Sequence, residues 1–141
     1  MSAKKIIVAG NWKMNKTYLD AKGFVAKLNQ KENFDTEVIL AVPALYADTL
    51  YINTQKENVH IVLQNCSAYT EGAYTGEISA QMIASLDMKY CLVGHSERRT
   101  LFGETDEVIA QKINQLLTYH LRPIFCIGET LAEREAHRTF A

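Results

Sequence analysis

Residues 90–99 read Tyr-Cys-Leu-Val-Gly-His-Ser-Glu-Arg-Arg, a short apolar run that changes abruptly into a glycine and a polar segment. A run of this length and composition is typical of a strand that is buried on both faces of a parallel sheet. The loops that follow such strands bind ligands in α/β folds. This stretch therefore predicts a class of fold and also the edge of the sheet where chemistry should occur.

Similar apolar runs recur along the chain and predict five strands, at residues 5–9, 37–42, 59–63, 90–93 and 123–127. Two apolar stripes with helical spacing lie between them, formed by Ala21, Phe24, Val25 and Leu28 and by Ile109, Ile113, Leu116 and Leu117. Thr105 is expected to begin a helix, and Thr130 with Glu133 forms a capping box that predicts another. The alternation predicts parallel strands with right-handed crossovers, in either an open doubly wound sheet or a (β/α) barrel.

Composition limits the possible ligands. The 141 residues are 48% hydrophobic and 22% charged, as in an ordinary globular domain. The net charge of -1 gives no basic surplus for nucleic acid or lipid headgroups. We therefore expect a small ligand, with no nucleic-acid or membrane partner.

The three cysteines, Cys66, Cys91 and Cys126, are far apart and lie in apolar runs. Their spacing suits neither a zinc site nor a disulfide framework, so we interpret them as buried thiols in a reducing cytosol. The first residues do not resemble a signal or transit peptide. These features predict a cytoplasmic protein without a metal site.

Two loops after predicted strands carry candidate functional residues. Asn11 and Lys13 follow the first strand, where an amide and an ammonium suit a bound anion, although Lys13 as an ordinary solvated lysine is the alternative. His95 follows the fourth strand and precedes a polar turn. If that turn begins a helix, its positive end disfavours an imidazolium and leaves a neutral hydrogen-bond donor. The alternative is a histidine that only caps the helix.

Four stretches together resemble the triosephosphate isomerase family. Residues 9–15 (Ala-Gly-Asn-Trp-Lys-Met-Asn) are similar to its first-strand motif and residues 93–99 (Val-Gly-His-Ser-Glu-Arg-Arg) to its fourth-strand motif. Residues 72–79 resemble the long third loop of the family, and residues 126–131 resemble its fifth strand end. Tyr74 stands where the family more often has phenylalanine.

The resemblance implies an α/β fold, the TIM (β/α)8 barrel, of which residues 1–141 form the amino-terminal part of a single domain with roughly five strands and four helices. It implies interconversion of dihydroxyacetone phosphate and D-glyceraldehyde 3-phosphate through an enediolate, a step of glycolysis and gluconeogenesis, with no cofactor. The expected base is a glutamate after the sixth strand. Its motif does not occur in this sequence, so we expect residues 1–141 alone to be inactive.

The resemblance also assigns site residues. His95 polarises the substrate carbonyl as a neutral imidazole, Lys13 offsets phosphate and enediolate charge, and Asn11 donates to the substrate. Glu97 is expected to act through Lys13. Ser96 and Cys126 have supporting positions, Cys126 as a packed thiol beside the site. Arg98 and Glu104 are expected to form a structural ion pair.

The third loop predicts a partner. It is long and polar, and such loops are usually functional or interfacial. The resemblance implies a homodimer in which Thr75 inserts near Asn11 of the other subunit, with Tyr74 and Gly76 beside it and Met14 lining the receiving pocket. A flexible solvent loop is the alternative. The other histidines, His60, His120 and His137, match no site position and are expected at the surface or at caps.

Two other functions compete with this one. The first is a non-catalytic half-barrel that binds phosphate or acts as an interaction module, and the second is another (β/α) barrel enzyme acting on phosphorylated sugars. The presence of both Lys13 and His95 favours an enzyme over the first. The agreement of four motifs favours the isomerase over the second.

Overall fold

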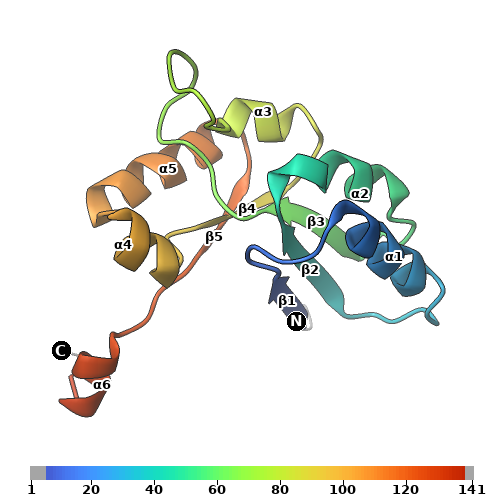
Figure 1. The fold of residues 1–141 in the computed structure, drawn as a ribbon, viewed down its shortest axis with the longest axis horizontal. Coiled ribbons are helices and arrows are strands. Elements are labelled where there is room, and N and C mark those ends of the chain that lie inside the picture. The colour runs from blue at the N-terminus through green and yellow to red at the C-terminus, as the bar shows by residue number, and fades with distance from the viewer. Residues whose placement is uncertain (1–5, 139–141) are drawn as a thin grey trace, which may run out of the picture.

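The computed structural model describes residues 6–138 and contains one parallel sheet with helices along its outer side (Figure 1). Its strands lie side by side in chain order, and each neighbouring pair is parallel. The strands are β1 (Ile7–Asn11), β2 (Glu37–Val42), β3 (Val59–Leu63), β4 (Tyr90–Val93) and β5 (Arg122–Phe125). A doubly wound sheet would reverse its strand order at a switch point. The unbroken order β1-β2-β3-β4-β5 is instead that of a half-barrel.

Side-chain caps fix where most of the helices begin. The helices are α1 (Tyr18–Asn29), η1 (Ala44–Tyr46), α2 (Ala47–Asn53), α3 (Ala80–Ala84), α4 (Ser96–Phe102), α5 (Asp106–Thr118) and α6 (Leu131–Glu135). Thr105 caps α5 and the Thr130–Glu133 capping box begins α6, as the sequence predicts. Roughly four helices were expected, and residues 6–138 contain six α-helices. A helix as short as α3, with five residues, does not show helical periodicity in the sequence.

The main core lies between the sheet and its helices. Leu50, Ile61, Ile83 and Leu116 are fully buried there. A smaller cluster on the other, concave face of the sheet contains Ile39, Ala41, Val62 and Leu92. The helix-covered face therefore supplies most of the apolar burial that holds the half-barrel together.

The edge strands differ from the prediction that every strand is buried on both faces. Ile7 and Val8 of β1 are 56% and 57% exposed, and Phe125 of β5 is 46% exposed. An edge strand has a neighbour on one side only, so its side chains lack part of their packing. The bounds of these strands also differ: β1 extends to Asn11, and β5 ends at Phe125, two residues early. Residue 5 of the predicted first strand lies outside the described residues.

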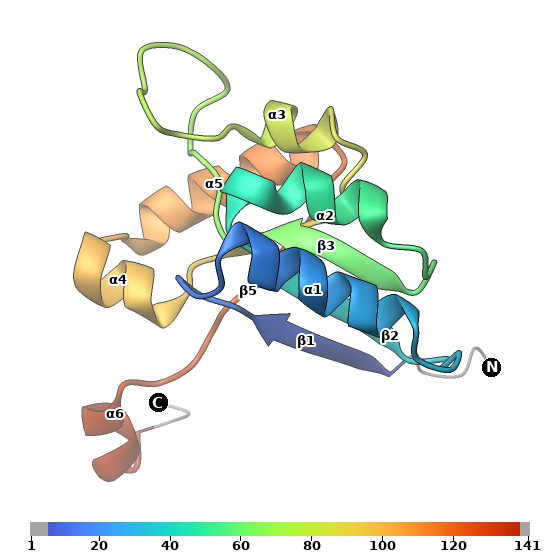
Figure 2. The ribbon, with the colours of Figure 1, turned by 45° about the vertical axis from the view of Figure 1, so that its right-hand side comes forward.

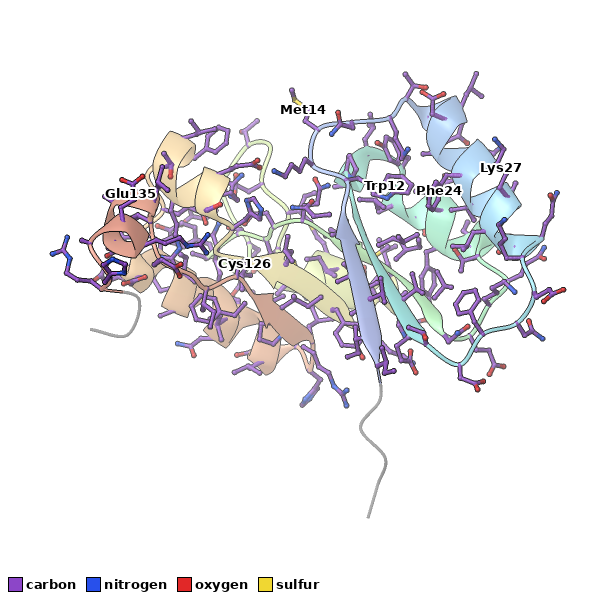
Figure 3. All side chains as sticks on the ribbon, turned by 90° about the horizontal axis from the view of Figure 1, so that it is seen from below. Trp12, Met14, Phe24, Lys27, Cys126 and Glu135 are labelled. Carbon is purple, nitrogen blue, oxygen red and sulfur yellow. The ribbon has the colours of Figure 1, made fainter. Side chains whose placement is uncertain are left out.

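Two members of the predicted helical stripes are not in the core. Leu117 is 55% exposed, and Phe24 is 38% exposed with its ring packed edge-on against Trp12 at a centroid distance of 5.2 Å (Figure 3). Of the stripe in α1, Ala21 and Val25 are buried, and of the stripe in α5, Ile109 and Leu116 are buried. Among the helices of residues 6–138, none has the length and apolarity that a membrane crossing requires.

Candidate active site

The end of β1 forms one side of the site. The side-chain oxygen of Asn11 accepts a hydrogen bond from the backbone N–H of Lys13 at 2.9 Å. Lys13 has a φ of 55°, a left-handed conformation that costs energy for a residue with a side chain. Gln64 compensates from the end of β3, because its amide nitrogen donates to the Lys13 carbonyl at 2.9 Å and to Asn11 Oδ1 at 3.3 Å. Gln64 therefore holds both candidate residues in place.

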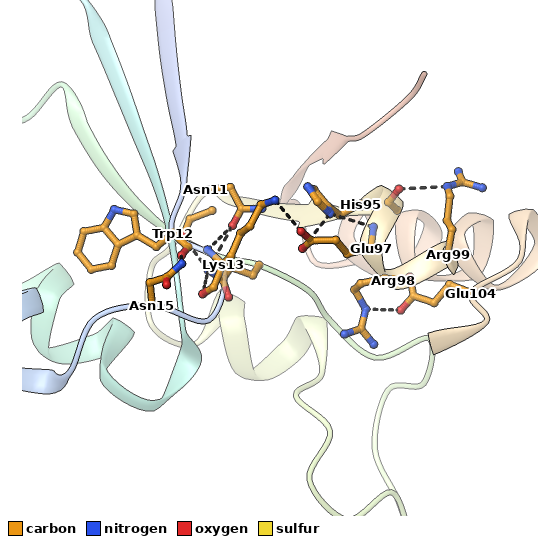
Figure 4. A network of polar contacts seen from close by, with 12 residues as sticks. Asn11, Trp12, Lys13, Asn15, His95, Glu97, Arg98, Arg99 and Glu104 are labelled. Carbon is orange, nitrogen blue, oxygen red and sulfur yellow. Dashed lines mark hydrogen bonds and ion pairs between the residues drawn. The ribbon is translucent and has the colours of Figure 1, made fainter. Parts of the chain in front are cut away.

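The Lys13 side chain crosses to the first turn of α4. Its Nζ lies 2.5 Å from Glu97 Oε1 (Figure 4). This contact lowers the pKa of Glu97, chiefly through the hydrogen bond from Lys13, so the carboxylate stays ionised. The two side chains are 50% and 43% exposed. Their charges thus remain open to an approaching ligand.

His95 is the N-cap of α4. Its Nδ1 accepts a hydrogen bond from the backbone N–H of Glu97 at 3.2 Å. In this hydrogen bond Nδ1 acts as the acceptor, which corresponds to the neutral tautomer of the ring with its proton on Nε2. The Glu97 carboxylate lies 3.5 Å from the same Nδ1 and is the less favourable partner in this tautomer. The expected helix start behind His95 is confirmed by α4.

Gly94 sets the direction in which His95 leaves the sheet. It has a φ of 70°, and a Cβ there would meet Phe125 and Ile109 at 3.2 and 3.3 Å. Only glycine fits this turn without displacing neighbouring side chains. Behind it, the guanidinium of Arg99 donates to the Gly94 carbonyl at 3.1 Å and closes the turn.

A hollow of about 530 Å³ opens beside the histidine. His95, Ser96 and Cys126 contribute to its lining, so the predicted supporting residues do lie beside His95. The prediction that all three cysteines are buried was wrong for Cys126, which is only partly buried, whereas Cys66 and Cys91 are buried. Cys126 follows β5, which is an edge strand of the sheet within residues 6–138. Partial burial raises the pKa of its thiol.

A buried ion network supports the other end of α4. Arg98 and Glu104 form the expected pair, with Nε and Oε1 2.5 Å apart. The same carboxylate oxygen also accepts from Lys112 of α5, and Lys112 donates to Asn65 at 2.8 Å. Lys112 and Glu104 each have side chains only 5% exposed. The network fixes α4, and with it Glu97 and His95, against α5 and the segment after β3.

Sequence reasoning missed Gln64 and Lys112. Gln64 directly follows an apolar run at the ligand edge of the sheet, which is the signal that would have drawn attention to it. Lys112 gave no such signal, since its apolar neighbours do not reveal a buried cation. His60 was predicted at the surface or at a cap, but it is partly buried. Its Nε2 lies 2.6 Å from Glu37 Oε2, because both side chains point to the concave face at neighbouring strands.

The third loop projects from the body of the molecule beside α3 (Figure 2). Its base is closed by a hydrogen bond from the backbone N–H of Ser67 to the Ile78 carbonyl at 2.8 Å. Tyr69 and Tyr74 stack in parallel across it, with ring centroids 4.1 Å apart. The loop residues Thr75 and Gly76 are exposed. The fold does not bring them into contact with Asn11 or Lys13 through any described hydrogen bond.

Met14 lies on the separate loop after β1. It is 96% exposed and points away from the sheet (Figure 3). The predicted interface residues are therefore available on the surface, on two different loops.

The arrangement can neutralise an anion and polarise a carbonyl. Lys13 supplies a positive charge, Asn11 an amide and His95 a neutral N–H donor, all on one edge of the sheet (Figure 4). Within residues 6–138 no group of three or more His, Cys, Asp or Glu side chains is placed to hold a metal ion.

Comparison with known proteins gives this arrangement a family. The family model described as triosephosphate isomerase matches residues 6–141. The triosephosphate isomerase of Acetivibrio thermocellus is 42% identical over 134 residues, which cover 94% of this chain and 53% of that protein. The triosephosphate isomerase of Mesomycoplasma hyorhinis is 43% identical, and the match covers 96% of this chain and 58% of that protein. The triosephosphate isomerase of Carboxydothermus hydrogenoformans is 45% identical, and the match covers 94% of this chain and 53% of that protein.

The chain spans about half the length of the curated relatives it matches. Across that half the match is continuous, and the four motifs and the strand order agree with it. The chain belongs to the triosephosphate isomerase family.

Proposed function

We propose that the protein acts as a triosephosphate isomerase, which interconverts dihydroxyacetone phosphate and D-glyceraldehyde 3-phosphate. The observation that carries the proposal is the convergence of Asn11, Lys13, Glu97 and a neutral His95 at the carboxyl edge of the half-barrel. Proton transfer next to a carbonyl needs an electrophile at the oxygen and a positive charge for the phosphate. These side chains have the chemistry for both.

Each residue has a proposed role. His95 donates its Nε2 proton in a hydrogen bond to the substrate oxygen, where negative charge grows as the enediolate forms. Lys13 stabilises that charge and the phosphate. Asn11 donates through its amide nitrogen, since its oxygen already accepts from Lys13 and Gln64. Glu97 positions the Lys13 ammonium, and Ser96 and Cys126 shape the hollow beside His95.

The base that removes the carbon-bound proton has no candidate by motif in these 141 residues. Glu97, Glu104 and Glu129 each match a different position of the family, and all three are paired with Lys13, Arg98 or Arg134. We therefore expect a protein of residues 1–141 alone to lack isomerase activity until a fragment that supplies the remaining strands is added. A half-barrel that binds phosphate without turning it over is the second candidate function.

We also propose a homodimer. Met14 and the projecting third loop are exposed, and the Tyr69–Tyr74 stack holds that loop in one shape before any partner arrives. Thr75 of this loop would then act near Asn11 of a second subunit. Shortening the loop between Tyr69 and Glu77 should give monomers in sedimentation velocity, and a shortened protein that remains a dimer would contradict the assignment.

A cytoplasmic location fits the free cysteines of the described chain, since unpaired thiols are typical of reducing compartments. Fractionation of cells that express the tagged protein would test this location.

A matched pair of histidine variants tests the proposed activity. His95→Asn keeps a capping side chain for α4 but removes the imidazole, whereas His120→Asn makes the same change at an exposed turn where φ is 58°. The variants are made in a protein that contains residues 1–141 together with the remaining strands of the barrel. Their formation of D-glyceraldehyde 3-phosphate is measured with a coupled dehydrogenase. We expect activity in the parent and the His120 variant and a loss of about 100-fold or more in the His95 variant. No turnover in the parent, with phosphate binding retained, would favour the non-catalytic half-barrel.

A further inference from the structure

The loop between β1 and α1 contains two unusual backbone conformations. Lys13 and Lys16 have φ values of 55° and 69°, in the left-handed region that costs energy for residues with a Cβ atom. Such conformations persist only where neighbouring groups hold them. The loop carries the ammonium group of Lys13, so the groups that hold the loop also decide where this ammonium lies.

The start of the loop is held from the strand side. Trp12 is buried, and its backbone N–H donates to the Ala41 carbonyl of β2 at 2.9 Å. Its own carbonyl accepts a hydrogen bond from the side-chain amide of Asn15 at 2.8 Å (Figure 4). Gln64 donates to the Lys13 carbonyl from the end of β3. These contacts fix the chain as far as Lys13.

Tyr46 holds the other end of the loop. Its hydroxyl oxygen lies 3.2 Å from the carbonyl oxygen of Asn15 and 3.0 Å from that of Lys16. A carbonyl oxygen only accepts hydrogen bonds, so the hydroxyl is the donor and shares its one proton between the two. Burial raises the pKa of Tyr46, which keeps this proton in place. The strained segment is thus held on both sides.

The fold explains how Tyr46 reaches this loop. Strand β2 pairs with β1, so the loops that follow the two strands leave the sheet side by side. Tyr46 is the last residue of η1, which comes directly after β2 and Pro43. Its side chain belongs to the main core, and the residue is only 5% exposed. A phenylalanine ring would fill the same space, so the hydroxyl serves the loop and not the core.

We propose that Tyr46 is a positioning residue for Lys13. Its hydroxyl holds the segment 15–16, and the segment in turn directs the Lys13 ammonium toward Glu97, where the two charged atoms are 2.5 Å apart. The inference rests on the proposed function, in which Lys13 offsets the charge of the phosphate and the enediolate. Without the hydroxyl, the segment relaxes toward ordinary backbone conformations, and the ammonium spends less time beside Glu97.

Tyr46→Phe keeps the ring in the core and removes only the hydroxyl. It is made in a protein that contains residues 1–141 together with the remaining strands of the barrel. Tyr51→Phe is the matched control, because it removes a hydroxyl of α2 that donates to the Asp87 carbonyl at 3.4 Å. Comparison of the two variants separates the loss of a particular hydrogen bond from the loss of any tyrosine hydroxyl.

The first measurement needs no turnover. The Glu97 carboxylate is titrated by NMR, because its pKa is lowered chiefly by the hydrogen bond from Lys13. We expect the pKa of Glu97 to rise toward its ordinary value in Tyr46→Phe and to stay as in the parent in Tyr51→Phe. An unchanged pKa in Tyr46→Phe would overturn the proposal. An ordinary Glu97 pKa in the parent would also overturn it, since Lys13 would then not be held at Glu97.

Kinetics of the same proteins separate positioning from stability. We expect kcat/KM to fall about tenfold in Tyr46→Phe, with a lower kcat and a higher KM, since one ammonium meets both the substrate phosphate and the charge of the transition state. A lower melting temperature with unchanged kcat and KM would indicate a structural role and overturn the proposal. In Lys13→Met, adding Tyr46→Phe should cost little more, and a second tenfold loss would show that Tyr46 acts elsewhere. If the parent is inactive, the proposed function fails, and the Glu97 titration still decides the role of Tyr46.

Discussion

Two lysine–carboxylate pairs lie at opposite ends of α4, and they differ in almost everything except their chemistry. At the start of the helix, Lys13 meets Glu97 with side chains 50% and 43% exposed. Beyond its end, Lys112 meets Glu104 with both side chains 5% exposed. The first pair joins the loop after β1 to the first turn of α4, at the ligand edge of the sheet. The second joins Lys112 of α5 to Glu104, which lies two residues after the end of α4.

The difference in exposure predicts different roles for the two ion pairs. Water screens an exposed ion pair, so the pair contributes little to stability. Its position therefore needs another explanation, which in the proposed function is substrate binding. A buried pair has lost its hydration, and each charge then depends on its partner. The exposed pair should therefore be sensitive in activity assays, and the buried pair in unfolding experiments.

The largest expected effect is on the activity of the exposed pair. Lys13→Met, made in a protein that also contains the remaining strands, removes the charge that in the proposed function stabilises the enediolate and phosphate. We expect kcat/KM to fall by about two to four powers of ten, while the melting temperature stays within about 2 °C of the parent. Lys16→Met removes a charge three residues away, where φ is also positive, and should keep nearly full activity. Near-normal kcat/KM in the Lys13 variant would show that the proposed role is wrong.

The buried pair should show the opposite behaviour. Lys112→Met leaves the Glu104 carboxylate with Arg98 as its remaining cation, and we expect the free energy of unfolding to fall by about 3 kcal/mol. Replacing both partners, with Lys112→Met and Glu104→Leu, should recover part of that loss, since no unpaired charge stays buried. Urea denaturation measures both. A Lys112 variant as stable as the parent would mean that this lysine is hydrated in solution.

The pH dependence of stability sharpens the same contrast. Burial acts to raise the pKa of Glu104, but the hydrogen bonds from Lys112 and Arg98 outweigh it and lower the pKa below 4.5. A lowered folded-state pKa contributes stability that is present above the unfolded value and is lost as the pH falls through the folded value. Over that acidic window, the free energy of unfolding of the parent should fall with decreasing pH more steeply than that of Glu104→Gln, by up to about 1.4 kcal/mol per pH unit. Parallel curves for the two proteins would contradict this origin.

The sequence predicts strongly those parts of the molecule that depend on local pattern. Strands β2, β3 and β4 match the predicted residues because each is an apolar run with a neighbour on both sides. The caps at Thr105 and Thr130 follow from residue type alone. The family resemblance assigns Lys13, His95 and Glu97 to one site, and in the structure Lys13 and His95 each contact Glu97.

Other features depend on contacts between segments far apart in the chain. Lys112 lies within an apolar helix pattern, and only its approach to Asn65 and Glu104 explains a buried cation. Leu63 and Cys91 lie side by side only because β3 and β4 pair. The exposure of β1 and β5 was missed because the apolar pattern of a strand does not reveal whether it has a neighbour on each side.

The smallest expected effect comes from salt, and it tests the comparison most directly. Glu97→Gln removes the charge of the exposed pair, so its melting temperature should differ from the parent by about 2 °C or less at low ionic strength. In about 1 M sodium chloride the screening length falls to about 3 Å, and this difference should disappear. Glu104→Gln should keep its deficit at both salt concentrations, because the partners of Glu104 lie within the protein and not across solvent. Differential scanning calorimetry of the three proteins at two salt concentrations makes the measurement. If salt erased both differences equally, the buried pair would be as accessible to ions as the exposed one, and burial would no longer explain why the two pairs differ.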